Sequence, residues 1–500
     1  MKTFTKLFTL LLAVSIFATS CNKEDETKPD NPIEEEKDYN AVPFSATITL
    51  SPMQGGFSGV ELKQAFVSGD VVEITNPDVL YEPLSISADE FAGKSTASFS
   101  GELKVKKGAE PSKLTAVLKN GDNYNGGKPY NDVKQLESTA NDINKYSYWS
   151  CENFDYSASN TSVNLVQSTV FVEFNIPFTV NVNIKNGQAV FNTIFQGKGC
   201  FAVPNGATVE CADFLKNVVL KDKLFYSVSA QIPENCLPGL FSIAENKQIF
   251  FSKGNLQYLI CEGTWRLAPY QYHICFDDKE GMIDVGEDYA DYPGPDNWTD
   301  LFWWGAWIDG VSHSKAGKDT EGYNIPIGAD GNISGKCAFG EEWTVLSADE
   351  WNYLMFTRPN ADQKQGGAIV AGVVGWVILP DNWIEPEGIK PFEARFDVKY
   401  KEDIPNQYTK EEWEKMESAG AVFLPFTQEI WATLLINMNT MNDYQTRTYN
   451  TENNVYQLIG FSLLKSKAMT EEDGMQYGLG INFCNTVRLI QYFTPEVKVE

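Results

Sequence analysis

Three tryptophans within five residues, with an aspartate on either side, form the densest group of side chains that could bind a ligand. They are Trp303, Trp304 and Trp307, flanked by Asp300 and Asp309. Indole faces pack against the C–H faces of sugar rings, and carboxylates can orient sugar hydroxyls. The same tryptophans could pack in a core while the aspartates cap turns. Since three tryptophans so close together cannot all point inward from one strand, we predict that most are core and at least one is partly exposed. These five residues are the candidate ligand-binding site.

Few residues in the chain are suited to catalysis. It has two histidines, His273 and His313, and no nucleophile elbow, phosphate-binding loop or zinc-protease motif. A glycosidase needs only two carboxylates, which leave no local sequence pattern, so the absence of these motifs does not exclude a glycosidase. We predict a protein that is not an enzyme and that binds no cofactor.

Length and charge limit the architecture and the partners. Five hundred residues exceed what one core supports, so at about 100–200 residues per domain we expect two or three folded units. The net charge is −27, from 67 acidic and 40 basic residues. Binding to phosphate backbones depends on Lys and Arg that displace counterions. The composition therefore excludes nucleic acid as the main partner.

The N-terminus has the pattern of a secretory signal. Lys2 and Lys6 precede an apolar run of about 12 residues, which is too short to span a bilayer as a helix. The following FATSC, ending at Cys21, resembles the bacterial lipoprotein box, in which the cysteine is acylated. The resemblance implies a signal peptide at 1–20 and a lipid anchor, palmitate included, on Cys21. The alternative is an ordinary signal peptide followed by an incidental cysteine.

Residues 21–40 are acidic and rich in proline, as expected of an extended tether. A lysine followed at once by three acids also resembles the export signal of Bacteroidota lipoproteins. It consists of Lys23, Glu24, Asp25 and Glu26. This resemblance implies a lipid-anchored protein of the outer membrane that faces the cell exterior, whereas a plain spacer is the alternative.

Residues 41–237 show the alternation typical of half-buried strands. From residue 44 to 50 every second residue is apolar, and the pattern recurs twice before residue 120. We predict one or two antiparallel β-sandwiches, with lobes at 41–135 and 136–237.

The longest alternating run covers residues 174–184. Pro177 lies on its outward side, which predicts an edge strand, because proline has no N–H for a ladder. Asn186-Gly187 predicts a type I′ turn into the returning strand.

Two stretches of the first lobe resemble a known family. Residues 66–74, FVSGDVVEI, and 97–101, ASFSG, are similar to the N-terminal lobe of fimbrillin-like proteins of the Bacteroidota. Fimbrillins are pilus subunits with two sandwich lobes, exported as lipoproteins and assembled by donating a strand into a neighbour's groove. Here a large domain follows the second lobe. The resemblance therefore implies a terminal or accessory subunit, or a sandwich reused without a pilus role.

Residues 238–500 form a separate domain that contains eleven of the twelve tryptophans. Ser347 with Glu350, and Thr409 with Glu412, have the spacing of capping boxes. They predict helices over 348–357 and from 410 to just before Gly420. We expect an aromatic loop at 300–305 and short strands at 241–245, 249–258, 264–268, 375–380, 421–425 and 486–490.

The order of these segments resembles the C-type-lectin-like and sulfatase-modifying-factor-like group, and implies an α+β domain. The triplets by which calcium-dependent lectins bind Ca²⁺ are absent, so the oxygen-rich run at 380–387 is only a minor alternative for that ion. Formylglycine-generating enzymes need a cysteine pair near the C-terminus, where Cys484 stands alone. For Arg488 we expect a buried ion pair or a strand cap, and not ligand binding.

The cysteines beyond Cys21 show no C-x-x-C spacing, which argues against a zinc ribbon or a redox motif. Cys200–Cys211 and Cys261–Cys275 are the nearest disulfide candidates after export, and buried free thiols are the alternative.

These observations predict a surface-exposed, lipid-anchored adhesin or accessory fimbrial subunit. Its partners would be the membrane, fimbrial subunits, and a glycan or a host or bacterial surface protein. The alternative is a glycan-binding lipoprotein of a polysaccharide-capture system.

Overall fold

The computed structural model describes most of residues 37–493. The signal peptide, Cys21 and the tether, with its export signal, lie outside the described residues. So do several internal segments, which are 53–54, 58–59, 120–131, 138, 158–160, 212–214, 222, 260–261, 263, 276–280, 285–297, 304–342, 395–399, 428, 432–433, 438–440, 451–454, 464–477 and 480–482.

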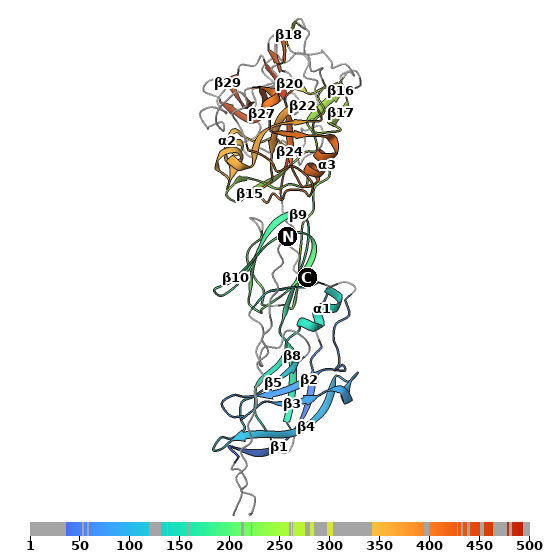
Figure 1. Ribbon diagram of the computed structural model, residues 1–500, viewed down its shortest axis with the longest axis vertical. Coiled ribbons are helices and arrows are strands. Elements are labelled where there is room, and N and C mark those ends of the chain that lie inside the picture. The colour runs from blue at the N-terminus through green and yellow to red at the C-terminus, as the bar shows by residue number, and fades with distance from the viewer. Residues whose placement is uncertain are drawn as a thin grey trace, which may run out of the picture.

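The described chain is mainly β-structure and forms three parts arranged in a line (Figure 1). We call them the first lobe, the second lobe and the head. The first lobe contains a seven-stranded sheet with the order β3-β2-β5-β7-β8-β1-β4. Its strands are β1 (Tyr39–Leu50), β2 (Val71–Thr75), β3 (Leu84–Ser87), β4 (Thr96–Lys106), β5 (Leu114–Lys119), β7 (Trp149–Phe154) and β8 (Thr161–Gln167), with a short 3₁₀ helix η1 (Asp89–Phe91).

Alternation in the sequence sets the faces of this sheet as predicted. In β1 the apolar residues that recur at every second position are buried in one cluster, together with Phe99 of β4 and Leu118 of β5. They are Phe44, Ala46, Ile48 and Leu50. Side chains of successive strand residues point to opposite faces, so the polar residues between them face away from this core.

The lobes divide the chain differently from the predicted boundary after residue 135. β7 and β8 lie beyond that boundary, yet β7 pairs with β5 and β8 pairs with β1. The pairing of β8 with β1 is parallel, with Ala46 opposite Thr161 and Leu50 opposite Leu165, so the expectation of a purely antiparallel lobe is wrong. Local composition does not show which distant strands pair, and after the polar stretch near residue 130 the chain returns to the first sheet.

The second lobe is built on a long hairpin. Its sheet has the order β12-β11-β9-β10-β6, and β13 also pairs with β9. The elements are β6 (Lys134–Gln135), α1 (Thr139–Tyr146), β9 (Val170–Asn186), β10 (Ala189–Val203), β11 (Thr208–Cys211), β12 (Leu215–Val219) and β13 (Phe225–Ser229).

Pro177 occupies a gap in the pairing of a central strand and not a sheet edge. β9 pairs with β10 on one side, and on the other with β13 through residues 171–175 and with β11 through residues 182–185. No described strand pairs with that second side at residues 176–181, and β10 has an irregularity between Phe195 and Gly197 opposite. Proline is tolerated at such a position because no ladder hydrogen bond is lost.

The turn of the hairpin also differs in detail from the prediction. Asn186 pairs with Ala189, so the loop residues are Gly187 and Gln188. Gly187 has a φ of 59°, and neither Asn186 nor Gln188 has a positive φ. One glycine with positive φ at the first loop position is typical of a type II′ turn and not of type I′.

Two residues, 168 and 169, connect β8 of the first lobe to β9 of the second, and hydrogen bonds fix both. The N–H of Ser168 donates to the carbonyl of Tyr148 (2.9 Å). The hydroxyl of Thr169 donates to the carbonyl of Tyr146 (3.0 Å) and accepts from the N–H of Tyr148 (2.9 Å). Beside this link Phe171 and Phe225 of the second lobe pack into the core of the first. The connection therefore has little freedom to bend.

The described residues of the head form four sheets of short strands. Three of them have the orders β14-β15-β31, β17-β16-β19 and β23-β21-β22-β24, and the fourth has the path β18-β26-β25-β30-β27-β28-β29 with β20 paired to β30. The strands are β14 (Phe241–Ala244), β15 (Lys247–Phe251), β16 (Leu256–Leu259), β17 (Thr264–Leu267), β18 (Gly281–Asp284), β19 (Trp298–Thr299), β20 (Leu301–Trp303), β21 (Gln365–Val370), β22 (Val373–Ile378), β23 (Asn406–Tyr408), β24 (Val422–Pro425), β25 (Glu429–Trp431), β26 (Leu434–Asn437), β27 (Met441–Asn450), β28 (Val455–Ser462), β29 (Gly478–Leu479), β30 (Phe483–Thr486) and β31 (Ile490–Tyr492).

Both capping boxes are confirmed. Ser347 caps α2 (Ala348–Asn352), which continues as a π-helical turn, η4 (Tyr353–Thr357), and Thr409 caps α3 (Lys410–Ser418). The head also has short 3₁₀ helices, η5 (Ala361–Gln363) and η6 (Lys401–Asp403). Gly420 follows α3 with a φ of 99°, and a Cβ there would lie 2.6 Å from the Cα of Gly239. Glycine is required here by the positive φ and by the close approach of the two segments that contain Gly420 and Gly239.

Two expected elements of the head differ. The expected aromatic loop at 300–305 contains a strand, β20, because the backbone of residues 301–303 pairs with β30. The expected strand at 486–490 is instead the connection between β30 and β31. Val487 and Leu489 are fully buried there, so their apolar character comes from core packing and not from strand pairing.

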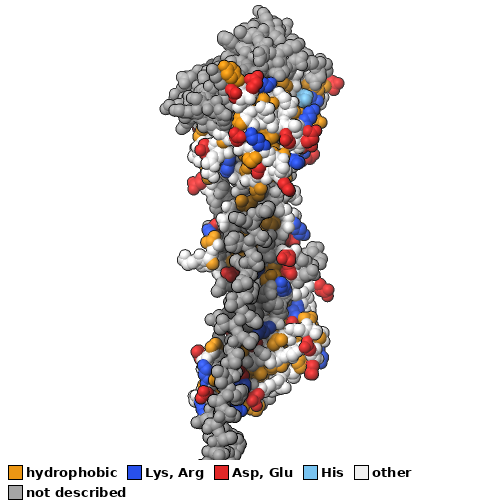
Figure 2. Space-filling view, viewed as in Figure 1, with side chains coloured by type: hydrophobic (Ala, Val, Ile, Leu, Met, Phe, Trp, Pro, Cys, Tyr) orange, Lys and Arg blue, Asp and Glu red, His pale blue; other side chains and the backbone are white. Residues whose placement is uncertain are grey.

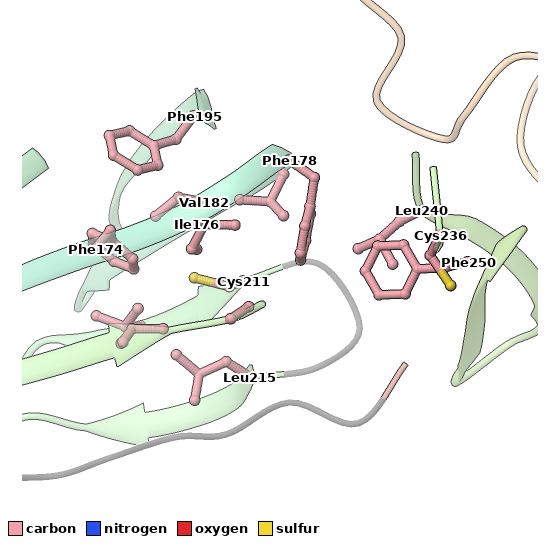
Figure 3. Close-up of a cluster of buried hydrophobic side chains, with 14 of the residues drawn as sticks. Phe174, Ile176, Phe178, Val182, Phe195, Cys211, Leu215, Cys236, Leu240 and Phe250 are labelled. Atoms are coloured by element: carbon pink, nitrogen blue, oxygen red, sulfur yellow. The ribbon is translucent and has the colours of Figure 1, made fainter. Parts of the chain in front are cut away.

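One apolar core crosses from the second lobe into the head (Figure 3). Phe178 of β9 contacts Phe250 of β15 and Phe493, with ring centroids 5.3 and 5.4 Å apart. Phe250 and Phe493 also meet at 5.5 Å. Leu240 and Cys236 lie beside these rings in the same cluster. Because the two parts share one core, they are expected to move as one body.

Cys200 and Cys211, one of the two candidate disulfide pairs, are not joined to each other. Cys200 packs in the core of the first lobe, whereas Cys211 packs in the core shared by the second lobe and the head. Burial raises the pKa of the Cys211 thiol to about 12. The second candidate pair includes Cys261, which lies outside the described residues.

Candidate functional site

The structure places two of the five candidate ligand-binding residues. Trp303 ends β20, and Asp300 directly precedes that strand. Asp300 is fully buried, and its Oδ2 accepts a hydrogen bond from the backbone N–H of Cys275 (3.2 Å). This hydrogen bond ties the carboxylate to the backbone of a segment 25 residues earlier in the chain. The remaining three, Trp304, Trp307 and Asp309, lie outside the described residues.

The oxygen-rich run at 380–387 is occupied by internal contacts. Asp381 Oδ1 forms an ion pair with Arg358 (3.0 Å), and its Oδ2 accepts from Ser242 Oγ (2.7 Å) and Gln248 Nε2 (3.0 Å). Glu385 accepts from the indole N–H of Trp383. Both oxygens of Asp381 are thus already bonded to donors. Among the described residues no group of three or more His, Cys, Asp or Glu side chains is arranged to hold a metal ion.

The Arg358–Asp381 pair is a buried ion pair inside the head. The Arg358 side chain is 1% exposed, and it also donates to the carbonyls of Leu354 and Leu379. Burial lowers the pKa of Arg358, and the charge of Asp381 opposes that shift. The pair ties η4 to the segment after β22, a structural role.

Glu350 of α2 is the centre of a second internal network. Its carboxylate pairs with Lys247 (2.8 Å) and Arg447 (2.5 Å), and it completes the capping box with Ser347. Burial acts to raise the pKa of Glu350, but the hydrogen bonds and charges of Arg447 and Lys247 outweigh it and lower the pKa. This network joins α2 to β15 and β27.

Arg488 is buried, as predicted, but its hydrogen bonds go to amides. Its Nη atoms donate to Asn255 Oδ1 (3.2 Å) and Gln271 Oε1 (2.7 Å). Burial lowers the pKa of this guanidinium to about 10. Gln271 links Arg488 to α3, because its Nε2 donates to Glu417 of α3 (2.9 Å) and to the carbonyl of Ala421 (3.1 Å).

Gln271 also fixes an aromatic pair that sequence reasoning missed. It lies between Tyr270 and Tyr272, whose rings stack with centroids 5.3 Å apart and an angle of 7°. Tyr270 is 56% exposed, whereas Gln271 is fully buried. Tyr272 is half-buried and packs against the core around Trp413 and Phe423, so that its ring supports the exposed ring of Tyr270. The result is a rigidly held aromatic surface on the head, which the spacing Tyr-x-Tyr could have suggested.

A second surface is the outer edge of β10. β9 pairs with β10 along one side, whereas on the other side β6 pairs only with Phe201 and Ala202. From Ala189 to Gly199 no described strand occupies that side. Val190 and Ile194, on the outer face of this segment, are 59% and 53% exposed. An unpaired strand edge with apolar side chains can accept another strand.

Comparisons with known proteins give weak likenesses. No family model matches the chain, and no curated protein matches it. A candidate cell adhesion protein from Bacteroides eggerthii is 10% identical with a TM-score of 0.21, over 39% of this chain and 87% of that one. A candidate polysaccharide-binding protein from Bacteroides thetaiotaomicron is 10% identical with a TM-score of 0.22, over 40% and 94%. A fimbrial assembly protein from Parabacteroides distasonis is 11% identical with a TM-score of 0.20, over 46% and 100%. Scores this low carry no argument about function.

The described part of the chain thus offers two surfaces suited to binding. It also contains no helix that is long and apolar enough to cross a membrane. On the face of the head that Figure 2 shows, acidic and basic side chains are mixed, so the net charge of −27 does not form an acidic patch there.

Proposed function

We propose that the chain is a surface-exposed adhesin or accessory fimbrial subunit, anchored to the outer membrane through acylated Cys21. The two β-lobes form the stalk. The head, residues 238–500, carries the binding surface and has a C-type-lectin-like α+β fold. Fimbrial subunits, and a glycan or surface protein, are the partners.

The observation that carries this proposal is the continuity of packing along the molecule. Phe171 and Phe225 join the lobes, and Phe178 with Phe250 joins the second lobe to the head. Hinged domains would have small, polar interfaces. A stiff line of three parts holds the head at a fixed distance from the other end, which is what an adhesin requires of its stalk.

The open edge of β10 supports the fimbrial role. We expect the double variant Val190→Lys/Ile194→Lys to remain folded, because both side chains are exposed and such substitutions change stability by about 0.5 kcal/mol or less. Charges on an edge oppose the addition of a strand. The amount of chain recovered with fimbriae sheared from the cells should therefore fall to background.

A matched control is available at the opposite edge of the same sheet. Val219 ends β12 and is 47% exposed, so Val219→Lys adds a charge to a similar apolar site without touching β10. It should leave recovery with fimbriae unchanged. Recovery of the Val190→Lys/Ile194→Lys variant at the level of the unmodified chain would rule out this edge as the assembly surface.

A glycan-binding lipoprotein of a polysaccharide-capture system is the second candidate. It is favoured by the exposed ring of Tyr270, which is stacked on Tyr272, because flat aromatic surfaces in extracellular sites pack against sugar rings. A chain that binds polysaccharide but is absent from fimbriae would favour this candidate.

A further inference from the structure

Arg266 of β17 is held flat against an aromatic ring at the surface of the head. Its guanidinium carbon lies 3.6 Å from the centroid of the Trp298 ring. Its Nε donates to Gln257 Oε1 (2.9 Å). The residue is half-buried, and Trp265 beside it packs inward on the shared core. The ring contact and the hydrogen bond together hold the guanidinium in place.

The support behind Arg266 is itself fixed. Gln257 is the cross-strand partner of Arg266 in the ladder of β16 and β17, and it is fully buried. Its Nε2 is 2.9 Å from Nδ1 of His273. The N–H of His273 in turn donates to the carbonyl of Tyr270 (3.0 Å). Arg266 and the turn that carries the tyrosine pair therefore belong to one hydrogen-bonded unit.

The two Nη atoms of the Arg266 guanidinium have no acceptor among the described residues. Nε bonds to Gln257 and the face lies on Trp298, but neither Nη atom has a hydrogen bond or ion pair with a described residue. In contrast, Arg358 and Arg447 each pair with a carboxylate. A planar guanidinium with both Nη atoms available matches the two oxygens of a carboxylate.

We propose that Arg266 binds the carboxylate of an acidic sugar, such as a uronic or sialic acid. The Nη atoms donate to the two carboxylate oxygens, while Trp298 and Gln257 keep the guanidinium in place. Tyr270 supplies an exposed ring, on the same fixed unit, against which the C–H face of a sugar can pack. The fixed geometry reduces the entropy lost on binding.

This inference rests on the proposed role of the head as the binding domain. The two can fail separately. Adhesion or fimbrial incorporation without binding of acidic sugars would overturn the acidic-sugar site and leave the proposed function intact.

The test is calorimetric titration of the full, detergent-solubilised chain with glucuronate, galacturonate and N-acetylneuraminate oligosaccharides, and with neutral glucose and galactose oligosaccharides. We expect the acidic sugars to bind and the neutral ones to bind weakly or not at all. Arg266→Gln should reduce affinity about tenfold to hundredfold, as expected for the loss of hydrogen bonds to a charged group. Arg266→Lys keeps the charge but loses the fork and the stack, and should also lose affinity.

Lys253 provides the control. It is an exposed residue of the head, two positions after β15, and Lys253→Gln removes one positive charge without touching Arg266. Its affinity should match that of the unmodified chain. Equal affinities for acidic and neutral sugars, or equal losses in Arg266→Gln and Lys253→Gln, would overturn the proposal. So would binding of peptides through their C-terminal carboxylate in the absence of sugar binding. A circular dichroism melt of each variant shows that it is folded.

Discussion

Replacing Phe178 by alanine is expected to separate the unfolding of the second lobe from that of the head. Phe178 is 1% exposed and meets Phe250 and Phe493 edge to face at the junction. Removing a buried phenylalanine ring leaves a cavity and costs about 3–5 kcal/mol. The loss falls on ring contacts that join the two parts. Calorimetry should therefore show one coupled transition for these parts in the unmodified chain and two in the variant.

Phe174→Ala is the matched control for that experiment. Phe174 lies on the same face of β9, is fully buried, and contacts Phe195 and Phe201 within the second lobe. Its loss should lower the stability of the lobe by a similar amount and leave the coupling intact. If Phe178→Ala and Phe174→Ala gave the same calorimetric profile, the junction would not be the source of the coupling, and the stiff stalk would lose its support.

The second large effect is expected for Asp381→Asn. The substitution removes the charge that faces Arg358, whose side chain is 1% exposed. A buried charge without its partner is strongly destabilising, so the free energy of unfolding of the head should fall by about 3 kcal/mol. Chemical denaturation, followed by the fluorescence of the head's tryptophans, measures this loss.

An exposed pair sets the baseline. Lys390 and Glu393 form an ion pair at 2.9 Å, with side chains 60% and 50% exposed. Solvent screens such a pair, so Glu393→Gln should cost less than about 1 kcal/mol. Comparable losses of unfolding free energy in Asp381→Asn and Glu393→Gln would show that the Arg358–Asp381 pair does not stabilise the head.

Elements defined by local sequence could be predicted, whereas their pairing could not. Ser347 and Thr409 each cap a helix through a residue three positions later in the chain, and the alternation in β1 is visible in consecutive residues. The parallel pairing of β1 with β8 joins residues more than one hundred positions apart. No local pattern encodes such a partner, and the predicted lobe boundary failed for that reason.

The candidate site shows the same limit. Counting tryptophans directed attention to residues 300–309, where the described part is a strand and a buried aspartate. The role of Arg266 depends on Trp298, Gln257 and His273, which are brought together by two strand pairings and a turn. A lone arginine between apolar strand residues carries no signal of this kind in sequence.

Exposure of the head on intact cells tests the central claim most directly. Intact cells are treated with a non-permeant protease, and the head is detected with an antibody raised against it. A periplasmic protein serves as the control for cell integrity, and Cys21→Ser tests the anchor. The account predicts that the protease removes the head while the periplasmic protein survives, and that the Cys21→Ser chain is absent from the membrane. A head that is degraded only after the cells are lysed would contradict it.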